Sequence, residues 1–418
     1  MVHVRRWKLG LARVGVLASL FWLVTIHAQT VGAEPAGLKA VFDAAWTRQP
    51  AALALAARRD AANAQQRVAR SWTPEPAALA LSTKGDRPGR HQGSREFEVG
   101  LAAPIWLPGE RAGSAALAQA EMSAIDSRIA AAQLRLAASV REAWWLWQRA
   151  RSDALAASEL LENHQRIAAD VARRAKAGEL ARADQHQAEG AVAATQAVRA
   201  QAAGAAAAAR LQLQALAGAP LDTALDDLPA RAADRNATPP EVETHAALSE
   251  LKDRIAVAQR TAALSATQTR ANPELTLAAT HARGAPGEAS AQTVTLGVRI
   301  PFSAGPSVDA RSASARADVI EAQALLAQER ARLLAERESA SVLLDAARAQ
   351  LAAAERRAQL ALESRGFFDK SFRLGETDLP TRLRVEAEAT EAQRQAARSR
   401  IELAAATSLW RQALGLLP

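Results

Sequence analysis

The stretch from Glu96 to Gly113, EFEVGLAAPIWLPGERAG, decides the fold because the chain contains it twice. A related stretch, TVTLGVRIPFSAGPSVDA, occupies residues 293–310, so that Gly100 aligns with Gly297 at a separation of 197 residues. Three further pairs have the same separation of 197: Pro104 with Pro301, Gly178 with Gly375, and Gly218 with Gly415. A repeat of this length is too long for a solenoid unit. We therefore interpret the chain as a duplication of one large unit.

Both copies have the same order of expected elements: a helix, a β-hairpin, a very long helix, a turn that contains glycine, and a returning helix. The first copy is expected at 34–218, with its helix at about 36–71, its hairpin at about 76–105 and its turn near Gly178. The second copy is expected at 241–418, with its helix at about 240–270, its hairpin at about 273–302 and its turn near Gly375. Residues 219–240 are rich in Pro and Asp and are the predicted linker.

The strands of both hairpins alternate apolar and polar residues over about ten positions. The predicted apolar face consists of Phe97, Val99, Leu101, Leu275, Leu277, Val294, Leu296, Val298 and Ile300. This period of two suits a half-buried sheet, and it equally suits a transmembrane barrel with lipid outside and water inside. Four strands cannot close a barrel, and an open edge in lipid would leave backbone groups unpaired at several kcal/mol each. If the sheet lies in a membrane, several copies of the chain must therefore pool their strands.

The long helices have very few residues that would interrupt them. Proline is absent from 109–176, and both proline and glycine are absent from 307–365. A helix of about 65 residues spans roughly 100 Å, which is far longer than a compact domain. A row at a spacing of seven residues predicts a coiled coil. It consists of Val319, Leu326, Leu333, Ala340, Ala347, Ala354 and Ala361. The predicted fold class is therefore mainly α with a small β part.

The N-terminus has the three-part pattern of a secretory signal peptide, predicted at residues 1–33. Four basic residues lie within the first 13 positions, an apolar run follows at 14–26, and small residues at 31–33 fit a cleavage site. The apolar run is shorter than the ~20 residues of a transmembrane helix. An uncleaved membrane anchor is the alternative.

Composition excludes several classes of function. The chain has 418 residues, of which 49% are hydrophobic and only 4% are aromatic, and it has no cysteine, which rules out disulfides, thiolate metal sites and cysteine-linked lipid anchors. Half of the net charge of +8 comes from the basic residues of the predicted signal peptide. The remaining charges of both signs are interspersed, which is typical of solvated helix faces rather than of a nucleic-acid-binding stripe.

No enzymatic motif is present, and we expect neither catalysis, a cofactor nor a metal site. Phosphate-loop, dinucleotide, zinc-protease and nucleophile-elbow patterns are absent, and the seven histidines share no ligand spacing. The cluster Trp144, Trp145 and Trp147 is the densest aromatic feature and is expected to serve in packing. Trp72, Trp106 and Phe302 flank the strands, where interfacial aromatic residues would lie.

The order of these features resembles the TolC-type outer-membrane efflux family. The resemblance rests on the signal peptide, the duplication, the strand pairs with Pro-Glu and Gly-x-x-x-Pro, and the glycine-containing helix tips. It covers about 35–418, and its most family-like stretches are ANPELTLAAT, VTLGVRIPFSAG and FRLGETDLPTRL. In the general character of its sequence, the chain most resembles the heavy-metal-efflux-like branch, whose members work with pumps of the resistance-nodulation-division type.

This resemblance implies a homotrimer in the outer membrane of a Gram-negative cell. The trimer would form a shared transmembrane β-barrel in lipid and an α-barrel across the periplasm. It would be the exit duct for small molecules or metal cations delivered by an inner-membrane pump and a periplasmic adaptor (membrane fusion) protein.

The resemblance also implies that the two glycine turns form the periplasmic entrance and contact the adaptor. The matching positions are Gly178, Glu179, Leu180, Asp184, Gly375, Glu376, Thr377, Asp378 and Leu379. Asp184 is the candidate for an acidic ring just beyond the tip, but the equivalent residue in the second copy is Thr381, for which Asp378 could substitute. An ordinary helix–helix turn capped by glycine is the alternative for these positions.

Two other classes of protein remain as alternatives. One is a periplasmic coiled-coil adaptor or scaffold without a channel, whose strands would form a small soluble domain. The other is a secreted amphipathic helical protein that binds lipids or surfaces. Neither requires twin β-hairpins, so the duplicated strand pairs favour the channel.

Overall fold

The computed structural model describes residues 36–86, 93–218, 240–302 and 305–418. The predicted signal peptide and nearly all of the predicted linker lie outside these ranges. The first copy contains α1 (Ala36–Thr47), α2 (Pro50–Leu53), α3 (Leu55–Arg70), β1 (Ala78–Gly85), β2 (Arg95–Pro104), α4 (Glu110–Lys176) and α5 (Arg182–Ala217). The second contains the 3₁₀ helix η1 (Val242–Thr244), α6 (Ala246–Thr267), β3 (Glu274–Arg283), β4 (Ala291–Arg299), α7 (Pro306–Arg373) and α8 (Leu379–Ala413).

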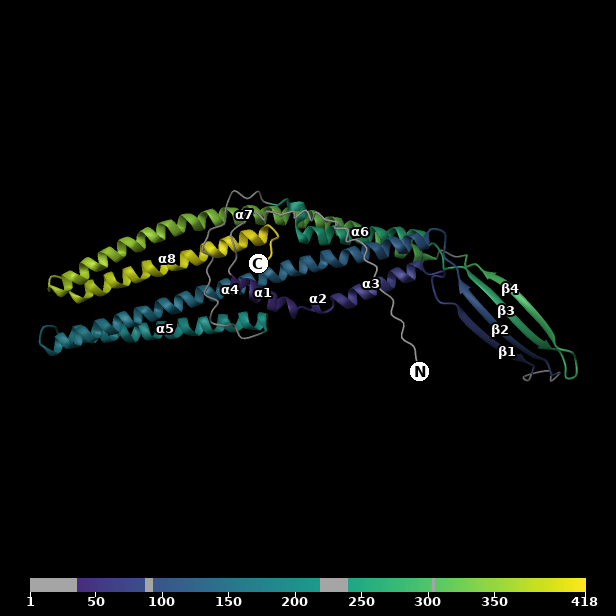
Figure 1. The fold of residues 1–418 in the computed structure, drawn as a ribbon, viewed down its shortest axis with the longest axis horizontal. Helices are drawn as coiled ribbons and strands as arrows, with labels where there is room; N and C mark the ends of the chain where they lie inside the picture. The colour runs from purple at the N-terminus through teal and green to yellow at the C-terminus, as the bar shows by residue number, and fades with distance from the viewer. Residues whose placement is uncertain (1–35, 87–92, 219–239, 303–304) are drawn as a thin grey trace, which may run out of the picture.

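The molecule is elongated, with the sheet at one end and the turns of both helical hairpins at the other (Figure 1). One hairpin consists of α4 and α5, and the other of α7 and α8. The hairpins are joined side by side through contacts between α4 and α8, while α3 and α6 run along the sheet-proximal halves of α4 and α7. The C-terminus lies near the middle of the molecule (Figure 1).

The long helices are confirmed, with 67 residues in α4 and 68 in α7. Gly109 precedes α4 with a φ of 83°, and Pro306 opens α7, where its missing N–H has no intrahelical partner to lose. The prediction of one helix over 36–71 is wrong, because the chain breaks there into α1, α2 and α3. Pro50 accounts for the first break, since proline disfavours helical backbone at the preceding residue, and Gln49 is extended.

Small side chains allow the helices of each hairpin to pack closely. In the predicted seven-residue row, Leu333, Ala340, Ala347 and Ala354 are buried. Ala354 and Ala358 of α7 form a cluster with Ala392 and Ala396 of α8. Alanine costs no side-chain entropy in a helix and brings two backbones together, so an alanine-rich chain can hold a thin hairpin without a bulky core.

The largest apolar core lies near the middle of the molecule, where α1 crosses the hairpins. It joins Leu38 and Phe42 of α1 to Trp144 and Val140 of α4 and to Leu213 of α5. Trp144 is fully buried and meets Trp147 edge-on, with ring centroids 5.4 Å apart and an interplanar angle of 70°. The predicted packing role of the tryptophan cluster is confirmed.

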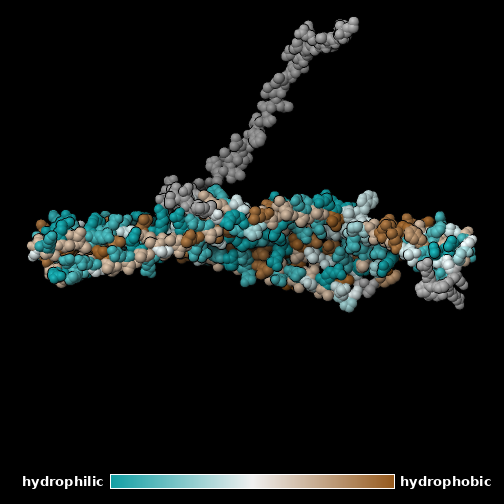
Figure 2. Space-filling model, turned by 90° about the horizontal axis from the view of Figure 1, so that it is seen from below, coloured by the Kyte–Doolittle hydropathy of each residue, from teal (hydrophilic) through white to brown (hydrophobic). Residues whose placement is uncertain are grey.

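The four strands form one antiparallel sheet in the order β1-β2-β3-β4. Its register places apolar residues opposite one another, with Leu101 beside both Leu79 and Leu277, and Leu277 beside Leu296. The predicted apolar-face residues are all exposed in this chain. Eight of these nine residues lie within the strands, and the ninth, Ile300, lies one residue beyond the end of β4. In the second view, hydrophobic residues gather where the sheet meets the helices (Figure 2).

A buried carboxylate ties the sheet to the helices. Glu110, in the first turn of α4, accepts hydrogen bonds from the backbone N–H of Leu107 at 2.9 Å, Asn272 Nδ2 at 2.6 Å and Gln268 Nε2 at 2.7 Å. Asn272 also donates to the carbonyl of Ile105 at 3.1 Å. Glu110 therefore links the start of α4 in the first copy to the segment between α6 and β3 in the second.

Within the described ranges, none of the helices combines the length and the apolar character that crossing a bilayer requires.

Candidate entrance and partner-contact site

Both hairpin turns have the same backbone geometry. Gly178 and Gly375 have φ values of 82° and 78°, in the left-handed region that favours glycine. In the first turn the N–H of Glu179 donates to the carbonyl of Arg174 at 2.9 Å, and in the second the N–H of Glu376 donates to that of Ser371 at 3.1 Å. These bonds are those of a Schellman motif, which ends a helix and reverses the chain. The two turns are thus structural copies, as the sequence separation predicts.

The acidic residues of the two turns cap the returning helices in different ways. Asp184 accepts from the backbone N–H of Ala181 at 3.1 Å at the start of α5. Asp378 is the N-cap of α8 and accepts from the backbone N–H of Thr381 at 3.1 Å. Hydrogen bonds from Thr381 hold the pKa of Asp378 below its ordinary value of 3.8, so this carboxylate is charged at neutral pH. The two acids lie at different distances from their glycines because they cap in opposite directions. Asp378 is the N-cap residue and accepts from a backbone N–H three residues later, whereas Asp184 lies in the first turn and accepts from a backbone N–H three residues earlier.

The predicted tip residues divide between the surface and the interior. Gly178, Glu179, Gly375, Glu376 and Asp378 are exposed, and Leu180, Asp184 and Thr377 are half-buried. Leu379 is buried at 2% exposure, so it cannot be a contact surface for a partner while the tip is folded. The expected adaptor-contact surface therefore reduces to the exposed glycines and acidic residues.

An apolar cluster joins the tips of the two hairpins. Ile167 and Val171 of α4 pack with Phe372 of α7 and Leu379 of α8, and Ala188 of α5 completes the buried set. The guanidinium carbons of Arg174 and Arg382 lie 5.0 and 4.6 Å from the centroid of the Phe372 ring. This cation–π arrangement places positive charge from both hairpins around one aromatic ring.

A charged cleft of about 590 Å³ lies next to this cluster, between α4, α7 and α8. Arg382 reaches across it, with Nη2 2.8 Å from Asp369 of α7 and Nη1 3.9 Å from Asp170 of α4. Further from the tip, Asn163 Nδ2 donates to Glu386 at 2.9 Å. The hairpins are thus held together at the tip by polar contacts whose partners are about 200 residues apart in sequence.

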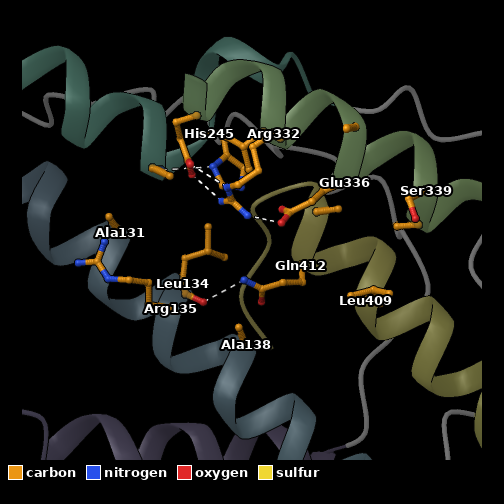
Figure 3. A pocket seen from close by; sticks show the side chains of 16 residues that line it. Ala131, Leu134, Arg135, Ala138, His245, Arg332, Glu336, Ser339, Leu409 and Gln412 are labelled. Atoms are coloured by element: carbon orange, nitrogen blue, oxygen red, sulfur yellow. Dashed lines mark hydrogen bonds and ion pairs between the residues drawn. The ribbon is translucent and has the colours of Figure 1, made fainter. Parts of the chain in front are cut away.

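A second cavity of about 760 Å³ lies midway along the molecule, among α4, α6, α7 and α8 (Figure 3). Its charged groups already have partners, because Arg332 pairs with Glu329 and Glu336 on α7. Gln412 Nε2 donates to the carbonyl of Leu134 at 3.0 Å. Gln412 therefore links α8 to α4 across this cavity, while the Arg332 pairs lie within α7.

The sheet offers a different kind of contact surface. Val294 and Leu296 of β4 are 74% and 71% exposed, and Phe97 of β2 is 52% exposed. Trp72 and Phe302 lie at the helix-proximal end of the strands and are 94% and 93% exposed. A contiguous apolar face of this extent marks a surface that meets lipid or protein.

Sequence reasoning missed the residues that join the two tips. Phe372, Arg382 and Asp170 were not distinguished from other helical residues because their contacts cross between the copies. One signal could have found the cluster. The stretch GFFDKSF at 366–372 concentrates aromatic residues beside the second turn, whereas the matching stretch of the first copy has none.

Known proteins share this fold. Residues 41–219 match the family model of the outer membrane efflux protein. The solved structure of CusC has a TM-score of 0.74 at 17% identity, covering 93% of this chain and 94% of CusC. VceC of Vibrio cholerae, an outer membrane protein, has a TM-score of 0.69 at 18% identity, covering 90% of this chain and 96% of VceC.

The outer membrane channel MtrE of Neisseria gonorrhoeae, solved in its open state, has a TM-score of 0.71 at 16% identity, covering 92% of this chain and 90% of MtrE. No curated protein sequence matches the chain. At these identities, the structural similarity shows a shared fold, which is mainly helical with four antiparallel strands and duplicated helical halves.

Proposed function

We propose that the chain is an outer membrane efflux protein of the TolC type and that it is the exit duct of a tripartite efflux system, which the family match of residues 41–219 and the fold support. Such a duct is a passive channel and not an enzyme. It lies in the outer membrane, and its helices extend into the periplasm. It conducts small molecules or metal cations that an inner-membrane pump and a periplasmic adaptor deliver. The heavy-metal-efflux-like branch remains a prediction, because the fold is common to the matched channels.

The observation that carries this proposal is the sheet whose apolar face is exposed along all four strands. Leu277, with Leu101 on one side and Leu296 on the other, lies in the middle of this face, and 49% of its surface is exposed. Apolar residues in such a row are unfavourable in water, at roughly 25 cal/mol per Å². Lipid is the environment that suits this face, with the opposite face turned toward water.

The open edges of the sheet support assembly from several copies. β1 and β4 are the edge strands, and among the described residues no strand pairs with the outer side of either one. In lipid those unpaired groups would cost several kcal/mol each, so the edges must pair with another chain. Channels of this family form trimers in tripartite pumps. Three copies would close one barrel and bring six hairpin turns together at the entrance.

Adaptor contact at the turns is the finer part of the proposal. The exposed turn residues include Glu179 in the first copy and Glu376 and Asp378 in the second. They present acidic groups at the far end of the helices from the sheet (Figure 1). A helical adaptor whose own tips carry basic residues would fit this surface.

The periplasmic scaffold without a channel loses support. A soluble scaffold would bury the apolar face of its sheet, but no described segment covers the residues of this face.

Export in a strain that lacks the gene tests the proposal. We expect the wild-type chain to restore resistance to the substrates of its pump. The double variant Glu179→Arg, Glu376→Arg should fail to restore it while the mass in detergent stays at three copies. The matched control, Asp309→Arg at the sheet-proximal end of α7, should export normally.

The possible outcomes separate the two parts of the proposal. Normal export by the double variant would overturn the assignment of the turns as the adaptor contact. A soluble wild-type monomer in the periplasm would overturn the channel itself.

A further inference from the structure

The apolar face of the sheet ends in two arginines. Arg95 begins β2 and Arg283 ends β3, and the register places them directly opposite one another. Because alternate residues of a strand share a face, Arg95 lies on the face that carries Phe97. For the same reason, Arg283 lies on the face that carries Leu277. The start of β2 and the end of β3 form the end of the sheet that is farther from the helices (Figure 1).

These two arginines have no ion pair among the described residues, although other charged residues of the sheet do. Lys84 lies 3.4 Å from Glu96, and Arg299 lies 3.8 Å from Glu274. Both pairs join residues that stand directly opposite one another on the polar face. The sheet therefore compensates its charges on the polar face, while the apolar face keeps two like charges side by side. Such a pair repels in a sheet, and an anion from outside the chain would relieve the repulsion.

The acidic residues of the adjoining turns do not neutralise the two arginines. Asp86 follows β1, and its buried Oδ2 has no hydrogen-bond partner. Glu288 lies in the turn between β3 and β4, where a Cβ at Gly284 would be 2.7 Å from its Oε2. In the described chain, neither carboxylate forms an ion pair with Arg95 or Arg283. Positive charge thus stays uncompensated at this end of the apolar face.

The length of the strands places the arginines at the border of a membrane. The outward apolar positions from Ile105 to Phe97 cover eight residue steps. At about 3.4 Å per residue and a tilt of about 40°, this is a height of roughly 20 Å, close to the ~25 Å apolar band of membrane barrels. Trp72 and Phe302 lie at the border near the helices, and Arg95 lies at the other border, two residues beyond Phe97. Basic side chains are tolerated at such a border but not at the middle of the bilayer.

A row of mixed polarity separates the arginines from the aliphatic residues. It consists of Thr83, Phe97, His281 and Gln292, which the register places side by side. Hydroxyl, imidazole and amide groups can hydrogen-bond to a lipid headgroup, whereas the leucines nearer the helices suit acyl chains. Along the strands, the face thus changes from aliphatic to mixed and then to cationic, as the chemistry of a lipid changes from its chains to its charged headgroup.

We propose that Arg95 and Arg283 bind the headgroup phosphate of an anionic lipid in the outer leaflet, whose acyl chains cover the apolar face. The inference rests on the proposed function, in which the sheet lies in the outer membrane and the helices extend into the periplasm. The end of the sheet farther from the helices then faces the outer leaflet. A guanidinium group can form two parallel hydrogen bonds with a phosphate. Directly opposite Cβ atoms lie about 5 Å apart, so both side chains can reach one phosphate.

The surroundings of the arginines favour a lipid over free phosphate. Arg95 is exposed and Arg283 is half-buried, so water competes with any purely ionic contact that they form. A lipid is held at two places at once, because its acyl chains contact the exposed Leu277 and Val99 of the same face. This second contact raises the effective concentration of the phosphate at the arginines.

Lipid retention in native mass spectrometry tests the proposal. The probe is diphosphoryl lipid A, a phosphate-bearing glycolipid, in phosphatidylcholine nanodiscs that contain the protein. We expect the wild type to retain lipid A on release from the nanodiscs. The double variant Arg95→Gln, Arg283→Gln should retain at least about fivefold less, because each basic side chain at an anionic surface strengthens binding severalfold. The control Lys84→Gln removes a cation from the polar face at the same end of the sheet and should retain as much as the wild type.

A thermal measurement separates lipid binding from a structural role of the two arginines. In detergent without anionic lipid the arginines only repel one another, so the double variant should melt at the same temperature as the wild type or higher. In nanodiscs with lipid A the wild type should melt higher than the variant, because a ligand of the folded state stabilises it. A variant that melts lower than the wild type by the same amount in both conditions would show a structural role and overturn the proposal.

The remaining outcomes distinguish the source of the phosphate and the level at which the inference fails. If excess inorganic phosphate raises the melting temperature of the wild type as much as lipid A does, the arginines bind a free anion and the lipid assignment is wrong. Equal lipid retention by the wild type and the double variant, with both inserted as trimers, would overturn the lipid site and leave the channel intact. A wild type that stays a soluble monomer and does not enter nanodiscs would overturn both.

Discussion

His245 holds the ends of two helices together through its ring. Its Nδ1 accepts a hydrogen bond from the backbone N–H of Ala247 at 3.3 Å and so caps α6, while the ring also hydrogen-bonds the backbone of Gln412 at the end of α8. Gly415 lies so close that a Cβ there would be 2.8 Å from the ring Cδ2. Burial is the main cause that lowers the pKa of His245 below its ordinary value of 6.5. Glu329, Arg332 and Glu336 of α7 are the charged groups that face it.

Acidification should therefore weaken this junction. The folded state prefers neutral His245, so below pH 6.5 the unfolded chain binds more protons than the folded one. The stabilisation is complete above pH 6.5 and is lost as the pH falls below that value. We expect the urea midpoint to decrease between pH 7.5 and pH 5.5.

The control for this prediction is His245→Asn, whose side-chain oxygen can still cap α6 but does not titrate in this range. Its urea midpoint should change less between the two pH values than that of the wild type. An equal decrease in both proteins would assign the pH dependence to other groups.

The sequence shows which residues alternate or repeat, but not which of them find distant partners. His245 was predicted to be one of several scattered histidines, and its role depends on Gln412, which lies about 170 residues away in the chain. Leu379 was expected at a contact surface because it is next to a turn. The structure buries it because Val171 and Phe372, from two different helices, meet there. Such burial depends on how two hairpins pack, and no local pattern records it.

At the scale of the elements, the junction of sheet and helices depends on the buried carboxylate of Glu110. Its three hydrogen-bond donors come from the segment before α4 and from the segment between α6 and β3. Leu107 is buried, so its N–H relies on the carboxylate, whereas Gln268 and Asn272 are half-buried. A positive helix N-terminus at α4 also favours the negative charge.

We predict that Glu110→Ala lowers the free energy of unfolding by roughly 2–4 kcal/mol, because it leaves one buried and two half-buried donors without this acceptor. Glu110→Gln should cost less, since its amide oxygen still accepts hydrogen bonds. Thermal unfolding followed by circular dichroism would measure both. Glu121→Ala, on the same helix with its side chain partly in solvent, is the control. Equal melting temperatures for the Glu110→Ala variant and the control would contradict the role of this carboxylate.

The elements themselves could largely be predicted from the sequence. The absence of proline from 109–176, and of proline and glycine from 307–365, predicted the long helices α4 and α7, and the period of two located β2 and β4. The first helix was the exception: the sequence 48–50, Arg-Gln-Pro, carries the break, but the apolar pattern around it suggested continuity. Side-chain faces of the strands followed from alternation alone, because burial in a sheet has the same period as the pleat.

At the scale of the whole molecule, ion pairs between α4 and α8 hold the two hairpins together near the tip. Hydrogen bonding to Glu391 and then to Asp153 raises the pKa of Arg394, so this residue stays charged throughout. Both partners in the Asp153–Arg394 pair are about one-third exposed, which limits the strength of the contact. Such a contact is suited to opening and closing.

Replacing Asp153 and Asp170 together with Asn should make the hairpins separate more readily. Two such partly exposed pairs contribute about 1 kcal/mol, which corresponds to a roughly fivefold shift in population. We expect a higher mean conductance in planar bilayers. Asp126→Asn, on α4 but paired with Arg59 of α3, is the matched control. A conductance equal to that of the control would contradict a role for the α4–α8 ion pairs in opening.

α4 and α7 are continuous, but the helices that run beside them are interrupted. This difference has a mechanical consequence. α4 runs beside α5 toward the tip and beside α3 toward the sheet, and α7 runs beside α8 and then α6 (Figure 1). Each long helix is thus continuous, whereas the helical layer beside it consists of two separate segments. A torque applied at the tip can be absorbed by sliding between these two segments before it strains the sheet. In the second copy the two segments meet where His245 lies beside Gly415, so any larger residue at position 415 would press on the imidazole ring and push the segments apart.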